Sequence, residues 1–151
     1  MLEITVAELA EADGLDLGAS PWQPMEQRRV DTFADATDDH QWIHVDPERA
    51  AEGPFGGTIA HGYLTLSLVP SLLKQLMRIT DHGRGTNYGL DKVRFTAPVP
   101  VGSELRLVAS VSESRRRDDG GVQYKVALTV EIKGQGRPAM VAESIYLTYP
   151  A

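Results

Sequence analysis

The sequence predicts an α+β fold in which an antiparallel sheet wraps around one long apolar helix. Apolar residues recur at helical spacing in the first half of the chain, whereas after Gly85 they alternate with polar ones at every second position. The helix expected near the middle of the chain is apolar around most of its circumference, so it must be covered on most sides. Strands with one apolar face can provide that cover, which favours helices segregated to one face of a sheet.

The first half of the chain is expected to be mainly helical. Residues 5–8 carry a capping-box pattern that opens a short helix ending before Gly14. Residues 21–24 suit a short edge strand, and residues 26–37 have the spacing of an amphipathic helix. Asp and Pro at the start of residues 46–51 are typical of the N-cap and first position of another short helix.

The central helix is expected over about residues 61–77, with a kink or an early break at Pro70 because proline lacks a backbone donor. A turn at residues 118–121 predicts a long hairpin. The predicted strands cover residues 88–97, 105–111, 122–132 and 139–149. A sheet of this kind wrapped around a helix is the hot-dog arrangement.

Length and composition limit the classes of function. A chain of 151 residues is expected to form a single domain, residues 1–151, that needs no covalent staples. The absence of cysteine excludes disulfides, thiol nucleophiles and zinc–thiolate sites, and it fits a cytoplasmic location. A net charge of −6 without a basic face argues against a nucleic-acid partner. The N-terminus has no signal-peptide pattern and residues 63–77 are too short and polar to span a bilayer, so we expect a soluble protein with no membrane partner.

Acid–base chemistry is indicated by the segment between the two helices of the first half. Asp39 and His44 place a carboxylate and an imidazole five residues apart, where they can hold one water molecule between them. Gly62 follows at the start of the central helix, where an unpaired backbone N–H can bind a carbonyl oxygen that gains negative charge. Together the groups suggest an acid–base pair with an oxyanion donor.

Each of these residues also has an interpretation without catalysis. Asp39 can cap the preceding helix, His44 can be a hydrogen-bonded histidine, and Gly62 can be a packing glycine. His61, at a helix start where a cation is disfavoured, suits packing or a hydrogen bond near the cap. A metal site of His40, His44, His61 and Asp39 is the less favoured alternative, because a turn does not bring His40 and His44 to one face; we therefore expect no metal.

Three motifs in order resemble the MaoC-like dehydratases, which include the (R)-specific enoyl-CoA hydratases. They are Asp39-x-x-x-x-His44, residues 53–62 and residues 87–95, and the likeness extends from Val30 to the C-terminus. The resemblance implies a hot-dog fold, a homodimer and an acyl-CoA thioester substrate. It implies reversible hydration of trans-2-enoyl-CoA to (R)-3-hydroxyacyl-CoA without a cofactor.

The resemblance also implies the roles of the site residues. Asp39 and His44 would form the catalytic dyad, and the Gly62 N–H would receive the thioester oxygen. Many relatives have Asn-Pro inside the first motif where this chain has Gln41 and Trp42, so Gln41 is the candidate for the residue that orients the dyad and contacts substrate. The alternatives are a dehydratase acting on acyl-carrier-protein substrates, a thioesterase, and a non-catalytic acyl-thioester-binding protein of the same fold.

Overall fold

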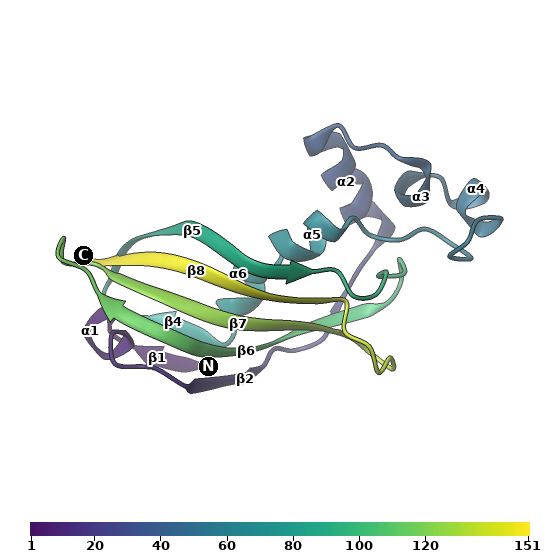
Figure 1. Cartoon of the computed structure of the whole chain (residues 1–151). Helices are drawn as coiled ribbons and strands as arrows, with labels where there is room; N and C mark the ends of the chain where they lie inside the picture. The colour runs from purple at the N-terminus through teal and green to yellow at the C-terminus, as the bar shows by residue number, and fades with distance from the viewer.

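The computed structural model describes all 151 residues and confirms the α+β prediction (Figure 1). The main sheet has six strands, with the order β2-β6-β7-β8-β5 and with β3 paired to β6 beside this path. All pairs within it are antiparallel. The strands are β2 (Leu15–Ala19), β3 (Gln23–Pro24), β5 (His82–Arg94), β6 (Glu104–Arg116), β7 (Val122–Ile132) and β8 (Met140–Pro150).

The central hairpin agrees best with its prediction. β7 has the predicted bounds, and its residues alternate between buried and partly buried along the whole strand. β6 is longer than residues 105–111, because its second half pairs with the start of β7. The turn lies where the glycines indicate it: Gly120 has a φ of 86°, and the Arg117 N–H donates to the Gly121 carbonyl at 2.9 Å.

The prediction of a strand over residues 88–97 is wrong at both ends, because β5 runs from His82 to Arg94. The early part contains glycines and polar residues that give no alternation, yet His82 already pairs with Pro150 of β8. Since β5 lies at the edge of the sheet and is exposed along most of its length, burial does not impose an alternating pattern on it.

The single long helix predicted over residues 61–77 is also wrong in extent. It is divided into α5 (Gly62–Ser67) and α6 (Val69–Leu73). The break agrees with the expected effect of Pro70, which cannot donate to the preceding turn. After α6 the chain turns into β4 (Met77–Ile79), which pairs in parallel with β1 (Leu2–Ile4) in a separate two-stranded sheet. Three-residue strands leave no periodic pattern, so this pairing escapes a sequence-based prediction.

The sheet curves around α6 and the end of α5, as the hot-dog arrangement requires (Figure 1). The inner faces of β6 and β7 join the two helices in one buried cluster, to which Leu64, Val69 and Leu72 contribute from the helices. The helical segment is covered on most sides, as predicted, and Tyr63, which is 71% exposed, lies on its open side. No helix in the structure combines the length and the hydropathy that crossing a bilayer requires.

The remaining helices follow the expected cap signals. α1 (Val6–Leu9) has the complete capping box between Thr5 and Glu8. At one end of the sheet lie α2 (Gln27–Thr37), α3 (Trp42–Val45) and α4 (Pro47–Ala51) (Figure 1). In α4 the Asp46 side chain accepts from the Arg49 N–H at 3.1 Å, as the predicted N-cap should. The segment between α2 and α4 is a turn followed by one turn of helix.

Candidate active site

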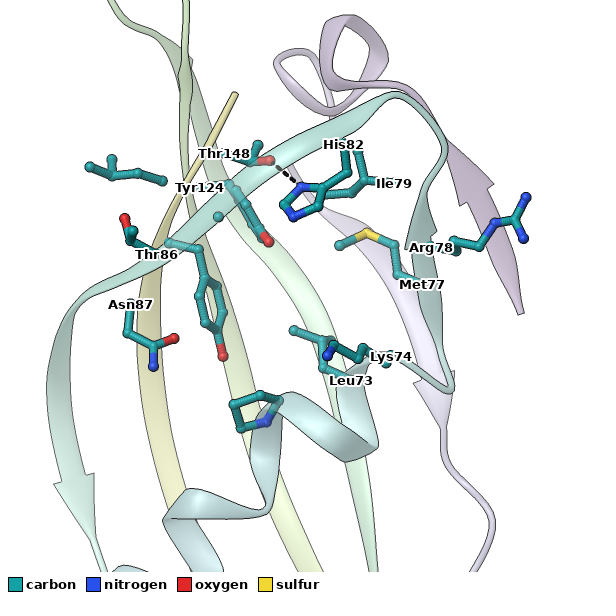
Figure 2. A pocket seen from close by; sticks show the side chains of 14 residues that line it. Leu73, Lys74, Met77, Arg78, Ile79, His82, Thr86, Asn87, Tyr124 and Thr148 are labelled. Carbon is teal, nitrogen blue, oxygen red and sulfur yellow. Dashed lines mark hydrogen bonds between the residues drawn. The ribbon is translucent and has the colours of Figure 1, made fainter. Parts of the chain in front are cut away.

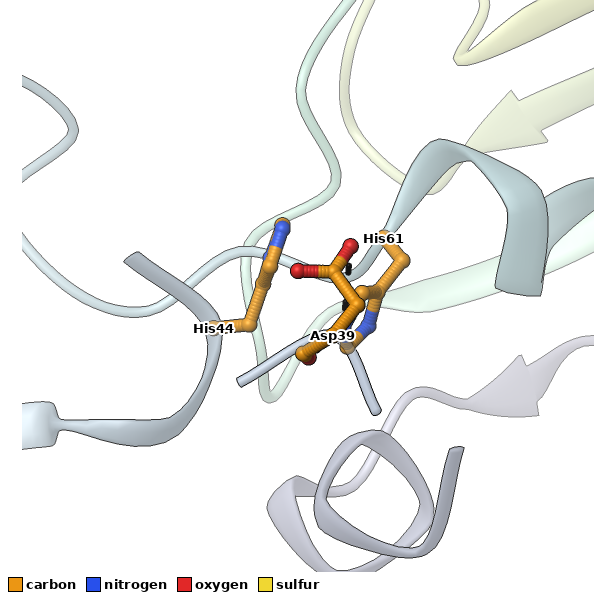
Figure 3. A group of neighbouring side chains, drawn as sticks. All are labelled: Asp39, His44 and His61. Atoms are coloured by element: carbon orange, nitrogen blue, oxygen red, sulfur yellow. Dashed lines mark hydrogen bonds and ion pairs between the residues drawn. The ribbon is translucent and has the colours of Figure 1, made fainter. Parts of the chain in front are cut away.

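Three polar side chains meet where the chain following α2 passes the start of α5. They belong to Asp39, His44 and His61, and one carboxylate or imidazole atom of each lies within 4.8 Å of the others (Figure 3). The two histidines are buried, whereas the Asp39 side chain is 52% exposed. The two imidazole rings therefore form the buried side of the cluster, and the carboxylate forms the side that solvent or a ligand can reach.

Asp39 reaches this position because α2 ends in a left-handed residue. Asp38 has a φ of 59°, a conformation that aspartate adopts more readily than most residues, and it turns the chain back after Thr37. The Asp39 carboxylate also accepts from the Gln41 N–H at 3.4 Å. Asp39 therefore does not cap α2, whose C-cap is Asp38; its carboxylate forms a turn with Gln41 and lies in the cluster.

His44 is held in one tautomer by the backbone. Its Nδ1 lies 2.7 Å from the Ile59 carbonyl oxygen, which can only accept, so Nδ1 carries the proton. Nε2 is then the unprotonated, accepting nitrogen of the neutral ring. Burial lowers the pKa of His44 below its ordinary value of 6.5, more than the Ile59 bond and the Asp39 carboxylate raise it. The ring is accordingly a neutral hydrogen-bond acceptor at pH 7.

His61 packs against His44 and also binds the chain at Asp39. The two imidazole rings are stacked with centroids 3.8 Å apart, and Phe33 lies against His61 at 4.9 Å. The His61 Nε2–H donates to the Asp39 backbone carbonyl at 2.9 Å, and its buried Nδ1 has no partner. The structure therefore confirms the packing and the cap-region hydrogen bond that the sequence suggests for His61.

The arrangement does not favour a metal ion shared by these groups. His40, one of the four residues considered as ligands, lies away from the cluster and contacts Asp35 at 2.8 Å. An imidazole nitrogen binds a metal in the plane of its ring. The rings of His44 and His61 are within 24° of parallel, so their lone pairs project side by side instead of converging on one point.

Gly62 begins α5, so its N–H has no acceptor within the helix, and no hydrogen bond from it is formed elsewhere. The space around its Cα is limited on one side. A Cβ at this position would lie 3.1 Å from the ring of Phe95, in the segment after β5. The glycine thus has an unpaired N–H and a close packing contact, and both interpretations given to it from the sequence have a structural basis.

Gln27 is a site-supporting residue that the sequence did not indicate. Its side-chain amide donates to the His44 carbonyl at 2.7 Å, while its oxygen accepts from the Thr58 hydroxyl at 2.6 Å. It therefore connects α2, α3 and the segment before α5. A glutamine in the first turn of an amphipathic helix carries no pattern that distinguishes it from a solvated residue.

The two residues inside the first motif lie outside the cluster. Gln41 is exposed, and it contributes its backbone carbonyl, which accepts from the His44 N–H at 3.0 Å; its side chain makes no hydrogen bond. The Trp42 ring lies against Gly53, with the guanidinium of Arg49 4.4 Å from its centroid. Trp42 thus packs the loop behind α4.

Comparison with known proteins agrees with this fold. The family described as MaoC like domain matches residues 9–133. The chain is 54% identical over 141 residues to "3-hydroxyacyl-thioester dehydratase Z" of Mycobacterium tuberculosis, covering 93% of each chain. It is 32% identical over 121 residues to the "(R)-specific enoyl-CoA hydratase" of Aeromonas caviae, covering 80% of this chain and 84% of the relative.

Among solved structures, R-hydratase PhaJ1 of Pseudomonas aeruginosa superposes with a TM-score of 0.78 at 23% identity, over 98% of this chain and 87% of that one. The protein is an enzyme of the hydratase and dehydratase type with the hot-dog fold. The chain belongs to the MaoC-like dehydratase family, as its three motifs indicate.

Proposed function

We propose that the protein catalyses the reversible, (R)-specific hydration of trans-2-enoyl-CoA to (R)-3-hydroxyacyl-CoA. The observation that carries the proposal is the neutral His44 ring beside the Asp39 carboxylate: a ring nitrogen lies within 4.8 Å of a carboxylate oxygen, and the proton held on Nδ1 leaves Nε2 as the acceptor. Two adjacent acceptors can bind both hydrogens of one water molecule. The relative 32% identical to this chain is named for this activity, and the relative 54% identical is named for the reverse direction on thioesters.

The proposed reaction adds the elements of water across the C2–C3 double bond. The water bound by Asp39 and His44 gives its oxygen to C3 and loses a proton to the pair. The electrons of the double bond move toward the thioester oxygen, which the Gly62 N–H stabilises. The pair then returns a proton to C2, and dehydration follows the same steps in reverse. Because the two groups are coupled, we assign base and acid to the pair.

A metal or organic cofactor is not required for this chemistry, because the thioester itself makes the C2 proton acidic.

The first alternative function, a dehydratase for acyl-carrier-protein substrates, differs from the coenzyme A enzyme in the carrier of the acyl group. Comparing kcat/KM for one acyl group on both carriers distinguishes them. A thioesterase would release free thiol, and a non-catalytic binder would give no turnover.

We further propose that two copies of the chain associate through β5. β5 is thirteen residues long, and one of its edges is unpaired at the margin of the sheet. Tyr88 and Leu90 on this strand are 60% and 46% exposed, and Tyr63 and Phe95 form an exposed aromatic pair nearby. A long edge with apolar side chains is prone to pair with another strand, so a continuous sheet across a homodimer would protect it.

The decisive experiment is to incubate the enzyme with crotonyl-CoA and with longer trans-2-enoyl-CoAs and to determine the chirality of the product. We expect (R)-3-hydroxyacyl-CoA with the thioester intact. Release of free coenzyme A or formation of the (S) product would contradict the proposal, and so would absence of turnover on every chain length.

A further inference from the structure

A groove runs between the helical segment α5–α6 and the strands β5 and β8. It consists of two adjoining cavities of about 410 and 540 Å³, which share Pro70, Asn87 and Tyr146 as lining residues. Volumes of this size are typical of small-molecule sites. Figure 2 shows the larger cavity, bounded by Leu73 and Lys74 from the helical side and by Tyr124 and Thr148 from the sheet.

The groove begins close to Gly62 and leads away from it. Leu66, four residues after Gly62 in α5, lines the nearer cavity, and Leu73 in α6 lines the farther one. The sheet gives the same direction. Gly62 lies beside Phe95, which directly follows β5, and Arg94 at the end of β5 pairs with Val141 at the start of β8. At the opposite end His82, which lines the farther cavity, pairs with Pro150. A chain attached at Gly62 would thus follow β8 from its start to its end.

The side chains on the inner face of β8 change in character along this direction. The first two are apolar, and the next three carry hydroxyl groups. In order they are Met140, Ala142, Ser144, Tyr146 and Thr148. β7 contributes a further hydroxyl, that of Tyr124, which pairs with Tyr146 across the two strands. Ser144 and Tyr146 line the nearer cavity, and Tyr146 and Thr148 line the farther one together with Tyr124, whereas Met140 and Ala142 lie outside both. Hydroxyl groups are therefore present in both cavities, with two phenols in the farther one.

Several of these hydroxyls lack a protein partner. The Ser144 Oγ is buried without a hydrogen bond, although it lies close enough to the Tyr146 phenol to lower its pKa. Burial has the larger effect and raises the pKa of Tyr146, and it also raises that of Tyr124. Both phenols therefore keep their protons and can donate. Thr148 differs, because its hydroxyl is bonded to His82 at 3.0 Å.

A buried polar group without a partner is destabilising, so native proteins rarely keep one without a reason. A purely alkyl acyl chain in this groove would leave Ser144 and the two phenols unsatisfied. An oxygen atom on the chain could accept from them. Two cations also line the larger cavity: the Arg78 guanidinium, which lies 3.2 Å from Glu3, and the Lys74 ammonium, which has no ion pair.

We propose that the groove selects acyl chains that carry a neutral oxygen, a hydroxyl or a keto group, in their distal half. The proposal rests on the proposed hydratase function, and it names Tyr124, Tyr146 and Ser144 as the residues that recognise this oxygen. The chain length follows from the helix. Eleven residues separate Gly62 from Leu73, at most on the order of 16 Å at about 1.5 Å per residue, because the break between α5 and α6 shortens the span. An extended chain gains roughly 1.2 Å per bond, so about twelve carbons would reach Tyr124.

The experiment compares two trans-2-enoyl-CoAs of about twelve carbons, one unsubstituted and one with a terminal hydroxyl, with crotonyl-CoA as an internal reference for every variant. We expect the hydroxylated substrate to have the higher kcat/KM by about tenfold, the effect of one or two hydrogen bonds. Tyr124→Phe and Ser144→Ala each remove one hydroxyl with little change in shape, and each should bring this ratio toward one.

Tyr149→Phe is the matched control, because the Tyr149 hydroxyl is bonded to Asp119 outside the groove at 2.8 Å. It should leave the substrate ratio unchanged. Equal kcat/KM for the alkyl and hydroxylated chains, or a ratio insensitive to Tyr124→Phe and Ser144→Ala, would overturn the inference. Absence of crotonyl-CoA turnover would instead refute the proposed function. Titration calorimetry with saturated acyl-CoAs, with and without the hydroxyl, then tests recognition independently of catalysis.

Discussion

The imidazole rings of His44 and His61 stack with centroids 3.8 Å apart and planes inclined by 24°. One ring is held by the Ile59 carbonyl, and the other binds the Asp39 carbonyl. His61 therefore contacts both members of the proposed dyad without facing the water between them. We infer that it is a positioning residue, which fixes the distance between the carboxylate and the accepting nitrogen.

Replacing His61 by phenylalanine tests this role, because it keeps a ring on His44 but removes the bond to Asp39. We expect a fall in kcat of about fivefold to tenfold, the value of one hydrogen bond. His61 also lowers the pKa of His44, so its loss should move the acidic limb of the kcat/KM profile to higher pH. Phe33→Leu, which alters only the packing on the other face of His61, should leave the profile in place. An unchanged profile in His61→Phe would assign it to packing alone.

The lowered pKa of His44 makes stability depend on pH. The unfolded chain binds a proton at this residue near pH 6.5, whereas the folded protein binds it only at lower pH. The unfolded state thus holds more protons in the window between the two values, so the free energy of unfolding falls as the pH falls below 6.5 and does not change with this group above it. Urea denaturation of the wild type and of His44→Gln over this range should show that the difference between their free energies of unfolding becomes smaller as the pH falls. A difference that grows toward acid would reverse the sign and refute a depressed pKa.

The proposed dyad predicts a non-additive pair of mutants. Asp39→Asn and His44→Gln should each fold and yet lose roughly 10²–10⁴-fold in kcat for crotonyl-CoA hydration, the usual value of a positioned acid or base. The double mutant should be little worse than either single mutant, because the two groups act as a unit. Gln41→Ala is the matched control from the same motif, and it should have a much smaller effect because its side chain makes no hydrogen bond. Wild-type turnover in either dyad mutant would eliminate the assignment.

The edge strand β5 predicts the oligomeric state. Light scattering at low micromolar concentration should report about twice the chain mass of 16.5 kDa. The double substitution Tyr88→Lys and Leu90→Lys would bring like charges together where the two β5 strands pair, and it should shift the enzyme toward monomer. Ala19→Lys on β2, at the other margin of the sheet, should leave the mass unchanged. A fully active wild-type monomer would contradict association through β5.

Elements defined by burial or by a cap could be predicted from the sequence. β7 alternates because its inner face is covered along its whole length. Thr5, Asp46 and Pro70 determine where helices begin or break, and they do so through backbone groups close to them in the sequence. The bounds predicted for β5 are wrong because an exposed edge strand does not require apolar and polar residues to alternate. The pairing of β1 with β4 was missed because residues far apart in the sequence determine it.

The candidate site divides in the same way. The spacing of Asp39 and His44 together with family motifs indicates the dyad. The tautomer of His44 depends on Ile59, fifteen residues away, and the support from Gln27 depends on how three segments pack. Neither is encoded in a local pattern. The partial polarity of the groove is visible in the sequence of β8 only after its inner face is known.

The contact between Gly62 and Phe95 predicts a double-mutant cycle that separates packing from oxyanion binding. Gly62→Ala places a Cβ about 3.1 Å from the Phe95 ring, which is 44% exposed and can move. If the glycine is needed only for this packing, Phe95→Ala should remove the conflict, and the double mutant should regain the kcat/KM of Phe95→Ala. If the Gly62 N–H binds the thioester oxygen and the added methyl obstructs the substrate, the double mutant should remain impaired.

We expect the second outcome, with a loss that approaches the ~10²–10³-fold in kcat typical of a missing oxyanion donor. Melting temperatures of all four proteins decide whether each variant is folded, because alanine in a helix is favourable by propensity and should cost little stability. Gly57→Ala, a glycine with open space around its Cα, is the control for adding a methyl group near the site. Full recovery in the double mutant would make Gly62 a packing glycine and place the oxyanion donor elsewhere.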